Sequence, residues 1–196
     1  MKIAIDLNDV IRDYSNNFLK NYLLNYNREF DTSDFSFWTN EMQNLLIFKT
    51  DREYERFVYE DYSYELFGKN DTCERNTITD LKKFSEEIYD INNKNTIMFV
   101  SPMEIGPSIG YTYFFISKLG SDIREVYLPK DSFTIWDKCD VLITANPRLL
   151  DSKPEGKKSV KINFEYNNDC EADFTFNSFS EIANNENNIK KILNNE

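Results

Sequence analysis

Apolar and polar residues divide this chain into two kinds of segment. In some, short continuous apolar runs are bounded by polar clusters, and in others apolar residues recur every three or four positions. Continuous runs are typical of strands buried on both faces, whereas the longer spacing predicts helices with one apolar side. The runs predict strands at residues 1–5, 96–100, 123–128, 139–143, 159–163 and, as a short edge strand, 174–176. The periodic segments predict helices at residues 13–27, 110–119 and 178–193.

A long block between the first two strands has no strand-like alternation. Residues 28–92 instead contain short helical patterns at 41–48, at 51–67 with Asp51 as a candidate N-cap, and at 79–91. Residues 26–67 are rich in Phe, Tyr and Trp. These rings are expected to form the core of a small helical subdomain, and the alternative is an exposed aromatic surface that contacts a base or a protein partner.

Strands that alternate with helices after residue 92 favour an α/β fold with a mostly parallel sheet covered on both faces. The helical block interrupts this pattern after the first strand. The predicted organisation is therefore a core domain of residues 1–13 and 93–196, with a helical cap insertion of residues 14–92.

Composition excludes several classes of function. The formal charge of −11 disfavours a nucleic acid partner, because phosphate binding requires a basic surface. No apolar run approaches the length of a membrane helix, and the start lacks a signal-peptide pattern. The chain has no histidine, and its three cysteines show no metal-binding or disulfide spacing. These features predict a cytoplasmic protein that does not bind membranes, with a place in a virus particle as the alternative.

The first predicted strand ends in Asp6-Leu7-Asn8-Asp9-Val10. This pattern resembles the first motif of the haloacid dehalogenase-like (HAD) phosphohydrolases, a strand that ends in Asp-x-Asp-x-Thr/Val. A helical insertion after the first strand is similar to the cap of this family, and the layout is closest to the small 5′-deoxynucleotidase-like members. The resemblance implies a Rossmann-like HAD sheet flanked by helices.

The resemblance assigns roles to four positions. Asp6 matches the nucleophile, Asn8 falls on the acid/base position, and Ser101 matches the residue that holds a phosphoryl oxygen. The charge-neutralising lysine corresponds to Lys130, or to Lys138 on the other side of the expected spacing. Each has a structural reading as well: a helix cap for Asp6, a strand end for Ser101, and the surface for either lysine.

At two of the motifs that the resemblance covers, this sequence lacks the acidic residues that the family has. An amide at Asn8 cannot donate a proton to a leaving group, a step worth about 10²–10⁴-fold in rate. Thr144 and Ala145 stand where the family has the acids that help to bind Mg²⁺. Asp6 alone would be a weak Mg²⁺ ligand, and the placement of Asp151 cannot be predicted.

The apolar residues that form the strands are therefore present, while acidic groups needed for catalysis are missing. This combination favours a pseudoenzyme. Such a protein would need no cofactor and would act through a protein partner, as an interaction or structural protein, for example in a phage particle. The alternative is a Mg²⁺-dependent phosphohydrolase of the 5′-nucleotidase type. It would act on a small phosphate ester through an aspartyl-phosphate on Asp6.

Overall fold

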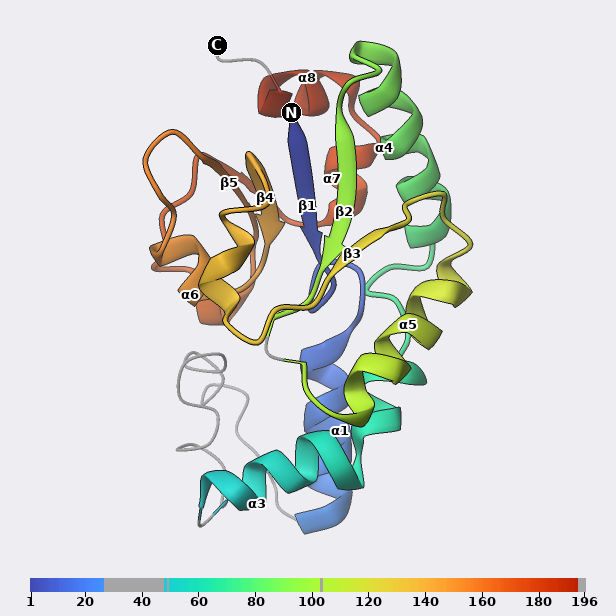
Figure 1. Ribbon diagram of the computed structural model, residues 1–196, viewed down its shortest axis with the longest axis vertical. Coiled ribbons are helices and arrows are strands. Elements are labelled where there is room, and N and C mark those ends of the chain that lie inside the picture. The colour runs from blue at the N-terminus through green and yellow to red at the C-terminus, as the bar shows by residue number, and fades with distance from the viewer. Residues whose placement is uncertain (27–47, 49, 103, 194–196) are drawn as a thin grey trace.

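A computed structural model describes residues 1–26, 48, 50–102 and 104–193 of the chain (Figure 1). The described residues form a six-stranded sheet in the order β3-β2-β1-β4-β5-β6, in which every neighbouring pair is parallel. The strands are β1 (Lys2–Asp6), β2 (Thr96–Val100), β3 (Glu125–Tyr127), β4 (Val141–Thr144), β5 (Lys158–Ile162) and β6 (Phe174–Phe176). The predicted α/β class, the parallel sheet and the position of residues 174–176 at one edge are confirmed.

Helices and helical turns connect the strands. The helices are α1 (Tyr14–Tyr26), α3 (Asp51–Arg56), α4 (Thr77–Ile91), α5 (Pro107–Leu119), α6 (Pro147–Asp151), α7 (Phe179–Ala183) and α8 (Glu186–Leu193). Two five-residue π-helical segments, η2 (Phe57–Asp61) and η3 (Tyr64–Gly68), follow α3, and two 3₁₀ turns are η4 (Ser132–Ile135) and η5 (Glu165–Asn167). Among the described residues, no helix is long and apolar enough to cross a membrane.

Both faces of the sheet are buried, which explains the continuous apolar runs of its strands. In β1, Ile3 and Ile5 contact one core and Ala4 contacts the other, because successive side chains of a strand point to opposite faces. The first core is completed by α4, α5, α7 and α8, and the second by η4 and α6. This arrangement fixes the carboxyl ends of β1, β2 and β4 side by side.

Aromatic rings form a separate core beneath these strand ends, between α1 and the segments α3, η2 and η3. Phe18 and Tyr22 of α1 pack against Phe57 and Phe48, with ring centroids 5.4–6.2 Å apart in the edge-on pairs. The described part of the aromatic block therefore forms a helical subdomain core, as its first reading predicts. The predicted helix at residues 41–48 lies outside the described residues, except for Phe48.

Two local predictions were wrong. The N-cap of α3 is Thr50, whose hydroxyl accepts a hydrogen bond from the backbone N–H of Glu53, and Asp51 is the first helical residue. The single closing helix is two helices, because Asn184 ends α7 and the Asn185 side chain accepts from the N–H of Asn187 at the start of α8. Asparagine side chains compete with the helical backbone for such bonds.

The domain boundaries at residues 13/14 and 92/93 remain a prediction. One observation bears on them: α4, which these boundaries assign to the cap, packs Leu81, Phe84 and Ile88 into the first core of the sheet. The aromatic subdomain core, in contrast, involves residues before α4.

Candidate functional site

Three polar side chains lie at the carboxyl ends of adjacent strands. Asp6 is the last residue of β1, Ser101 follows β2 directly, and Thr144 is the last residue of β4. All three are buried, with at most 1% of any of them exposed. The parallel register of β1 with β2 and β4 brings them to one edge, which is where ligands bind in open α/β sheets.

The Asp6 carboxyl group is held by uncharged donors. The Thr144 hydroxyl donates a hydrogen bond to Asp6 Oδ2 at 2.7 Å, and the backbone N–H of Asn8 donates to Asp6 Oδ1 at 3.3 Å. Burial raises the pKa of Asp6 from an ordinary value of 3.8 to about 7, although both hydrogen bonds act in the opposite direction. A large fraction of this carboxyl is therefore protonated at neutral pH.

Asn8, at the acid/base position, is bound to Arg12. Its Oδ1 accepts hydrogen bonds from Arg12 Nη2 at 2.6 Å and from Arg12 Nε at 3.0 Å. Arg12 is completely buried. The amide that replaces the expected acid therefore anchors an internal cation.

The same guanidinium contacts Ser101 and the surrounding elements. Nη2 donates to Ser101 Oγ at 3.2 Å and to Glu104 Oε1 at 2.9 Å, whereas Nη1 donates to Thr112 Oγ1 at 2.8 Å and to the carbonyl of Phe67 at 3.1 Å. Arg12 thus links the strand ends to α5 and to η3. We call these residues, with Asn8, the Arg12 network.

Arg12 and Glu104 were missed by sequence reasoning. Arg12 follows Val10-Ile11 and is followed by Asp13, so the local sequence does not mark it as buried. Arginine is rarely buried unless it is paired, and its partner Glu104 is distant in sequence. Only the folded chain reveals that the pair is internal.

Asp9 is hydrogen-bonded to other residues than Asn8 is. It has a positive φ of 60°, unusual for a residue other than glycine, and it accepts hydrogen bonds from the N–H of Ser15 at 2.8 Å, from the Ser15 hydroxyl, and from the Tyr166 hydroxyl at 2.9 Å. Burial raises the pKa of Asp9 as well. These partners differ from those of Asn8, which is bonded to Arg12, so the two side chains are held in different places.

The predicted lysines are not part of this arrangement. Lys130 is exposed in the loop after β3, and within the described residues it makes no hydrogen bond or ion pair with Asp6, Ser101 or Thr144. Lys138 places its ammonium group 5.8 Å from the ring centre of Tyr127. The buried cation near Asp6 is Arg12, and the assignment of Lys130 remains a prediction.

The residues at this edge do not fit Mg²⁺. This ion requires oxygen ligands and usually one or two ionised carboxylates, whereas Asp6 is the one carboxyl group among the three side chains at these strand ends and Thr144 supplies a hydroxyl. No group of three His, Cys, Asp or Glu side chains suited to a metal occurs within the described ranges. Asp151 is exposed at the end of α6, where it borders a cavity of about 530 Å³ with Lys153 and Asp173.

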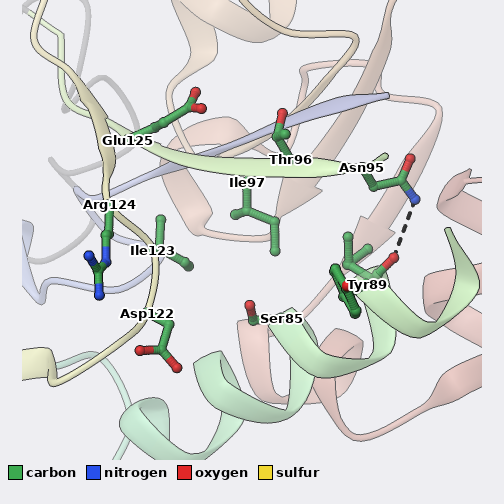
Figure 2. A pocket seen from close by; sticks show the side chains of 10 residues that line it. Ser85, Tyr89, Asn95, Thr96, Ile97, Asp122, Ile123, Arg124 and Glu125 are labelled. Atoms are coloured by element: carbon green, nitrogen blue, oxygen red, sulfur yellow. Dashed lines mark hydrogen bonds between the residues drawn. The ribbon is translucent and has the colours of Figure 1, made fainter. Parts of the chain in front are cut away.

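A second cavity, of about 260 Å³, lies between α4 and the strands β2 and β3 (Figure 2). Figure 2 shows Ser85 and Tyr89 of α4 on one side, and Thr96 and Ile97 of β2 with Arg124 on the other. Thr96 begins β2, while Ser101 follows its end. This cavity is therefore at the opposite end of the strand from Asp6 and takes no part in the candidate site.

Comparison with known proteins supports the fold. No family model matches the chain, and no curated protein matches it. A solved structure, described as a crystal structure of a dehalogenase with an intermediate complex, is similar with a TM-score of 0.56 and 13% sequence identity. The likeness covers 92% of this chain and 94% of that chain. The chain thus has a HAD-like α/β fold, and at this identity the likeness speaks for the fold alone.

Proposed function

We propose that this protein is a HAD-like pseudoenzyme without phosphatase activity, which serves as an interaction or structural protein. The observation that carries the proposal is the Arg12 network. Its guanidinium is bonded to the two positions, Asn8 and Ser101, that would handle the leaving group and the phosphoryl oxygen in an active relative. These positions are used to hold the fold together.

Arg12 has no donor to spare for a substrate. Its Nε, Nη1 and Nη2 atoms all donate to protein oxygens, and its guanidinium carbon lies 5.0 Å from the ring centre of Phe67 and 5.5 Å from that of Phe115. A phosphate could bind Arg12 only by displacing these acceptors. Unpairing buried polar groups in this way costs about 1–3 kcal/mol for each group.

The remaining charges oppose a phosphate. Asp6, Asp9 and Glu104 are buried acidic groups in this region, and the buried Arg12 forms its ion pair with Glu104. An ionised Asp6 would repel the incoming phosphate, and a protonated Asp6 would be a poor nucleophile. The net charge of −11 likewise supports a protein partner in preference to a nucleic acid.

One observation favours the second candidate, a Mg²⁺-dependent phosphohydrolase of the 5′-nucleotidase type. Asp6, Ser101 and Thr144 do converge at the edge where substrates bind in this class of sheet. In that reading, Asp6 forms an aspartyl-phosphate with a small phosphate ester. The poor fit of these residues to Mg²⁺ weighs against it.

A phosphatase assay separates the two candidates. The purified protein and its Asp6→Asn variant are incubated with an aryl phosphate and with deoxynucleoside monophosphates in the presence of Mg²⁺. We expect equal, background-level phosphate release from both proteins, and no change in melting temperature with Mg²⁺ and beryllofluoride. Turnover that the Asp6→Asn variant lacks would contradict the proposal.

A further inference from the structure

The helical segments around the aromatic core lie next to the strand ends that carry the candidate site. We call α1, α3, η2 and η3 the aromatic subdomain. Asp6 and Ser101 are buried, with at most 1% of either exposed, although they lie at the edge where open α/β sheets bind ligands. A ligand could reach them only if the surrounding elements moved. The contacts between the aromatic subdomain and the rest of the chain therefore decide whether this edge is accessible.

Helix α5 packs on the sheet and on the aromatic subdomain at the same time (Figure 1). Phe115 and Leu119 lie in the first core of the sheet. Tyr111 packs edge-on against Tyr64 of η3, with ring centroids 5.3 Å apart, and the ring of Phe114 lies 6.2 Å from that of the same tyrosine. This helix thus joins η3 to the sheet.

The approach of η3 to α5 is close at Gly68. A Cβ atom built at this glycine would lie 3.2 Å from Cβ of Tyr111 and 3.0 Å from Cδ2 of Tyr64. The Tyr64 ring can turn aside, but Cβ of Tyr111 is attached directly to the backbone of α5, so a side chain at position 68 would push the two segments apart. Gly110, on the exposed surface of α5, is the opposite case, because a Cβ atom built there has no neighbour within 4 Å.

Hydrogen bonds cross the same junction. Arg12 Nη1 donates to the carbonyl of Phe67 in η3 at 3.1 Å and to Thr112 Oγ1 of α5 at 2.8 Å. Lys118 Nζ of α5 donates to the carbonyl of Asn70, directly after η3, at 3.3 Å. Separation of η3 from α5 would leave buried polar groups of this junction without their partners, which is costly.

The two chain segments that lead into and out of the aromatic subdomain are bonded to each other. The backbone N–H of Asp13 donates to the carbonyl of Asp71 at 3.0 Å, and that of Cys73 donates to the carbonyl of Ile11 at 2.9 Å. A lid opens through changes of backbone angles in a few connecting residues. Here the hydrogen bonds hold the connecting residues in place, which opposes a hinge.

We propose that the aromatic subdomain is locked onto α5 and does not open as a lid over the strand ends. The lock consists of the close approach at Gly68, the bonds of Arg12 across the junction and the paired connecting segments. This inference goes beyond the proposed function, because a protein without phosphatase activity could still open and close. A locked subdomain unfolds together with the sheet as one cooperative unit.

Native-state hydrogen exchange, measured by NMR, tests the proposal. The amides of Tyr62, Leu66 and Lys69 report on the aromatic subdomain, and the amide of Leu7, which donates to the carbonyl of Val100 at 2.8 Å, reports on the sheet. We expect the most protected of the three amides to match Leu7 within about tenfold, with the same dependence on urea, because both require the same unfolding event. Protection more than about tenfold below that of Leu7 would overturn the proposal, since the subdomain would then open by itself.

The Gly68→Val variant should break the lock, because its side chain meets Cβ of Tyr111. We expect the most protected subdomain amide to lose about tenfold or more in protection relative to Leu7. Gly110→Val is the matched control, since it makes the same substitution on the exposed side of α5 and should leave this ratio unchanged.

A second variant covers the case in which Gly68→Val does not fold. Tyr64→Ala removes the ring contacts with α5 and should shift the ratio in the same direction. A wild-type ratio in a folded Gly68→Val variant, or in Tyr64→Ala where Gly68→Val does not fold, would overturn the proposal. None of these results changes the phosphatase assay, so the failure of this inference and that of the proposed function can be told apart.

Discussion

The two sides of the candidate site differ in whether their buried charged groups have a partner of opposite charge. On one side, Arg12 is fully buried and donates to five protein groups, one of which is the carboxylate of Glu104. On the other side, Asp6 and Asp9 are equally buried and receive hydrogen bonds from hydroxyl and backbone donors only. Burial raises the pKa of both of these carboxyl groups.

This difference shows which acidic group the buried Arg12 guanidinium pairs with. Arg12 stabilises the junction between the strand ends, α5 and η3, and it leaves the Asp6 carboxyl without a close counter-ion. A buried carboxyl without a counter-ion favours its neutral form. This contrast supports the proposed function, in which the edge of the sheet holds elements together and does not bind a phosphate.

The largest expected effect comes from breaking the Arg12 network. Arg12→Met leaves Glu104 buried without its cation and should lower the free energy of unfolding by about 3–5 kcal/mol. Adding Glu104→Met should recover a large part of this loss, because it removes the unpaired charge. Urea unfolding of the four proteins in this cycle measures both effects.

Arg124→Met serves as the control, since Arg124 is exposed and its change should stay within about 0.5 kcal/mol. If Arg12→Met were as mild as this control, the contrast between the two sides of the site would be wrong.

The next effect is a pH dependence that arises at Asp6. Its pKa is higher in the folded chain, so between about pH 4 and 7 the unfolded chain loses this proton first, and the free energy of unfolding falls as pH rises. The Asp6→Asn variant has no carboxyl group here and therefore lacks this pH dependence of the free energy of unfolding. Relative to the wild type, the variant should gain up to about 4 kcal/mol across this window and nothing further above it.

Stability curves measured from pH 4 to 8 check the result, with Asp140→Asn as the control. Hydrogen bonding by the backbone N–H of Lys2 lowers the pKa of Asp140, so this carboxylate gains its pH-dependent stabilisation mainly below about pH 4, and the difference between the Asp140→Asn variant and the wild type should stay nearly constant above about pH 5. A difference between wild type and Asp6→Asn that does not change with pH would refute the assignment of Asp6 as a carboxyl without a counter-ion.

The smallest effect concerns Asp9. Tyr166→Phe removes one hydrogen bond to this carboxyl and leaves both bonds from Ser15, so the expected loss of stability is about 1.5–3 kcal/mol. Tyr89→Phe, on the exposed surface, should change stability by less than about 0.5 kcal/mol. Equal unfolding midpoints for the two variants in urea would show that the hydrogen bond from Tyr166 to Asp9 contributes little to the stability of the protein.

The fold was largely predictable because both faces of the sheet are buried. That burial requires continuous apolar runs such as Thr96–Val100, and these runs are visible without any structure. The errors fall where local polar groups decide the outcome, as at Thr50 and at Asn184, because side-chain bonds to the backbone shift the ends of helices.

The candidate site was predictable only in part. Asp6, Ser101 and Thr144 could be placed at one edge, because parallel strands bring their carboxyl ends together. The contact of Arg12 with Glu104 spans 92 residues of sequence, and no local pattern contains such a pairing.

Residue type and local periodicity are enough to give the class of the fold, the order of strands and helices along the chain, and the lack of acids at positions 8, 144 and 145. The internal position of Arg12, the raised pKa of Asp6 and the outward orientation of Tyr113 and Phe114 are visible in the folded chain alone. Burial and distant partners set these properties, and both arise only when the chain has folded.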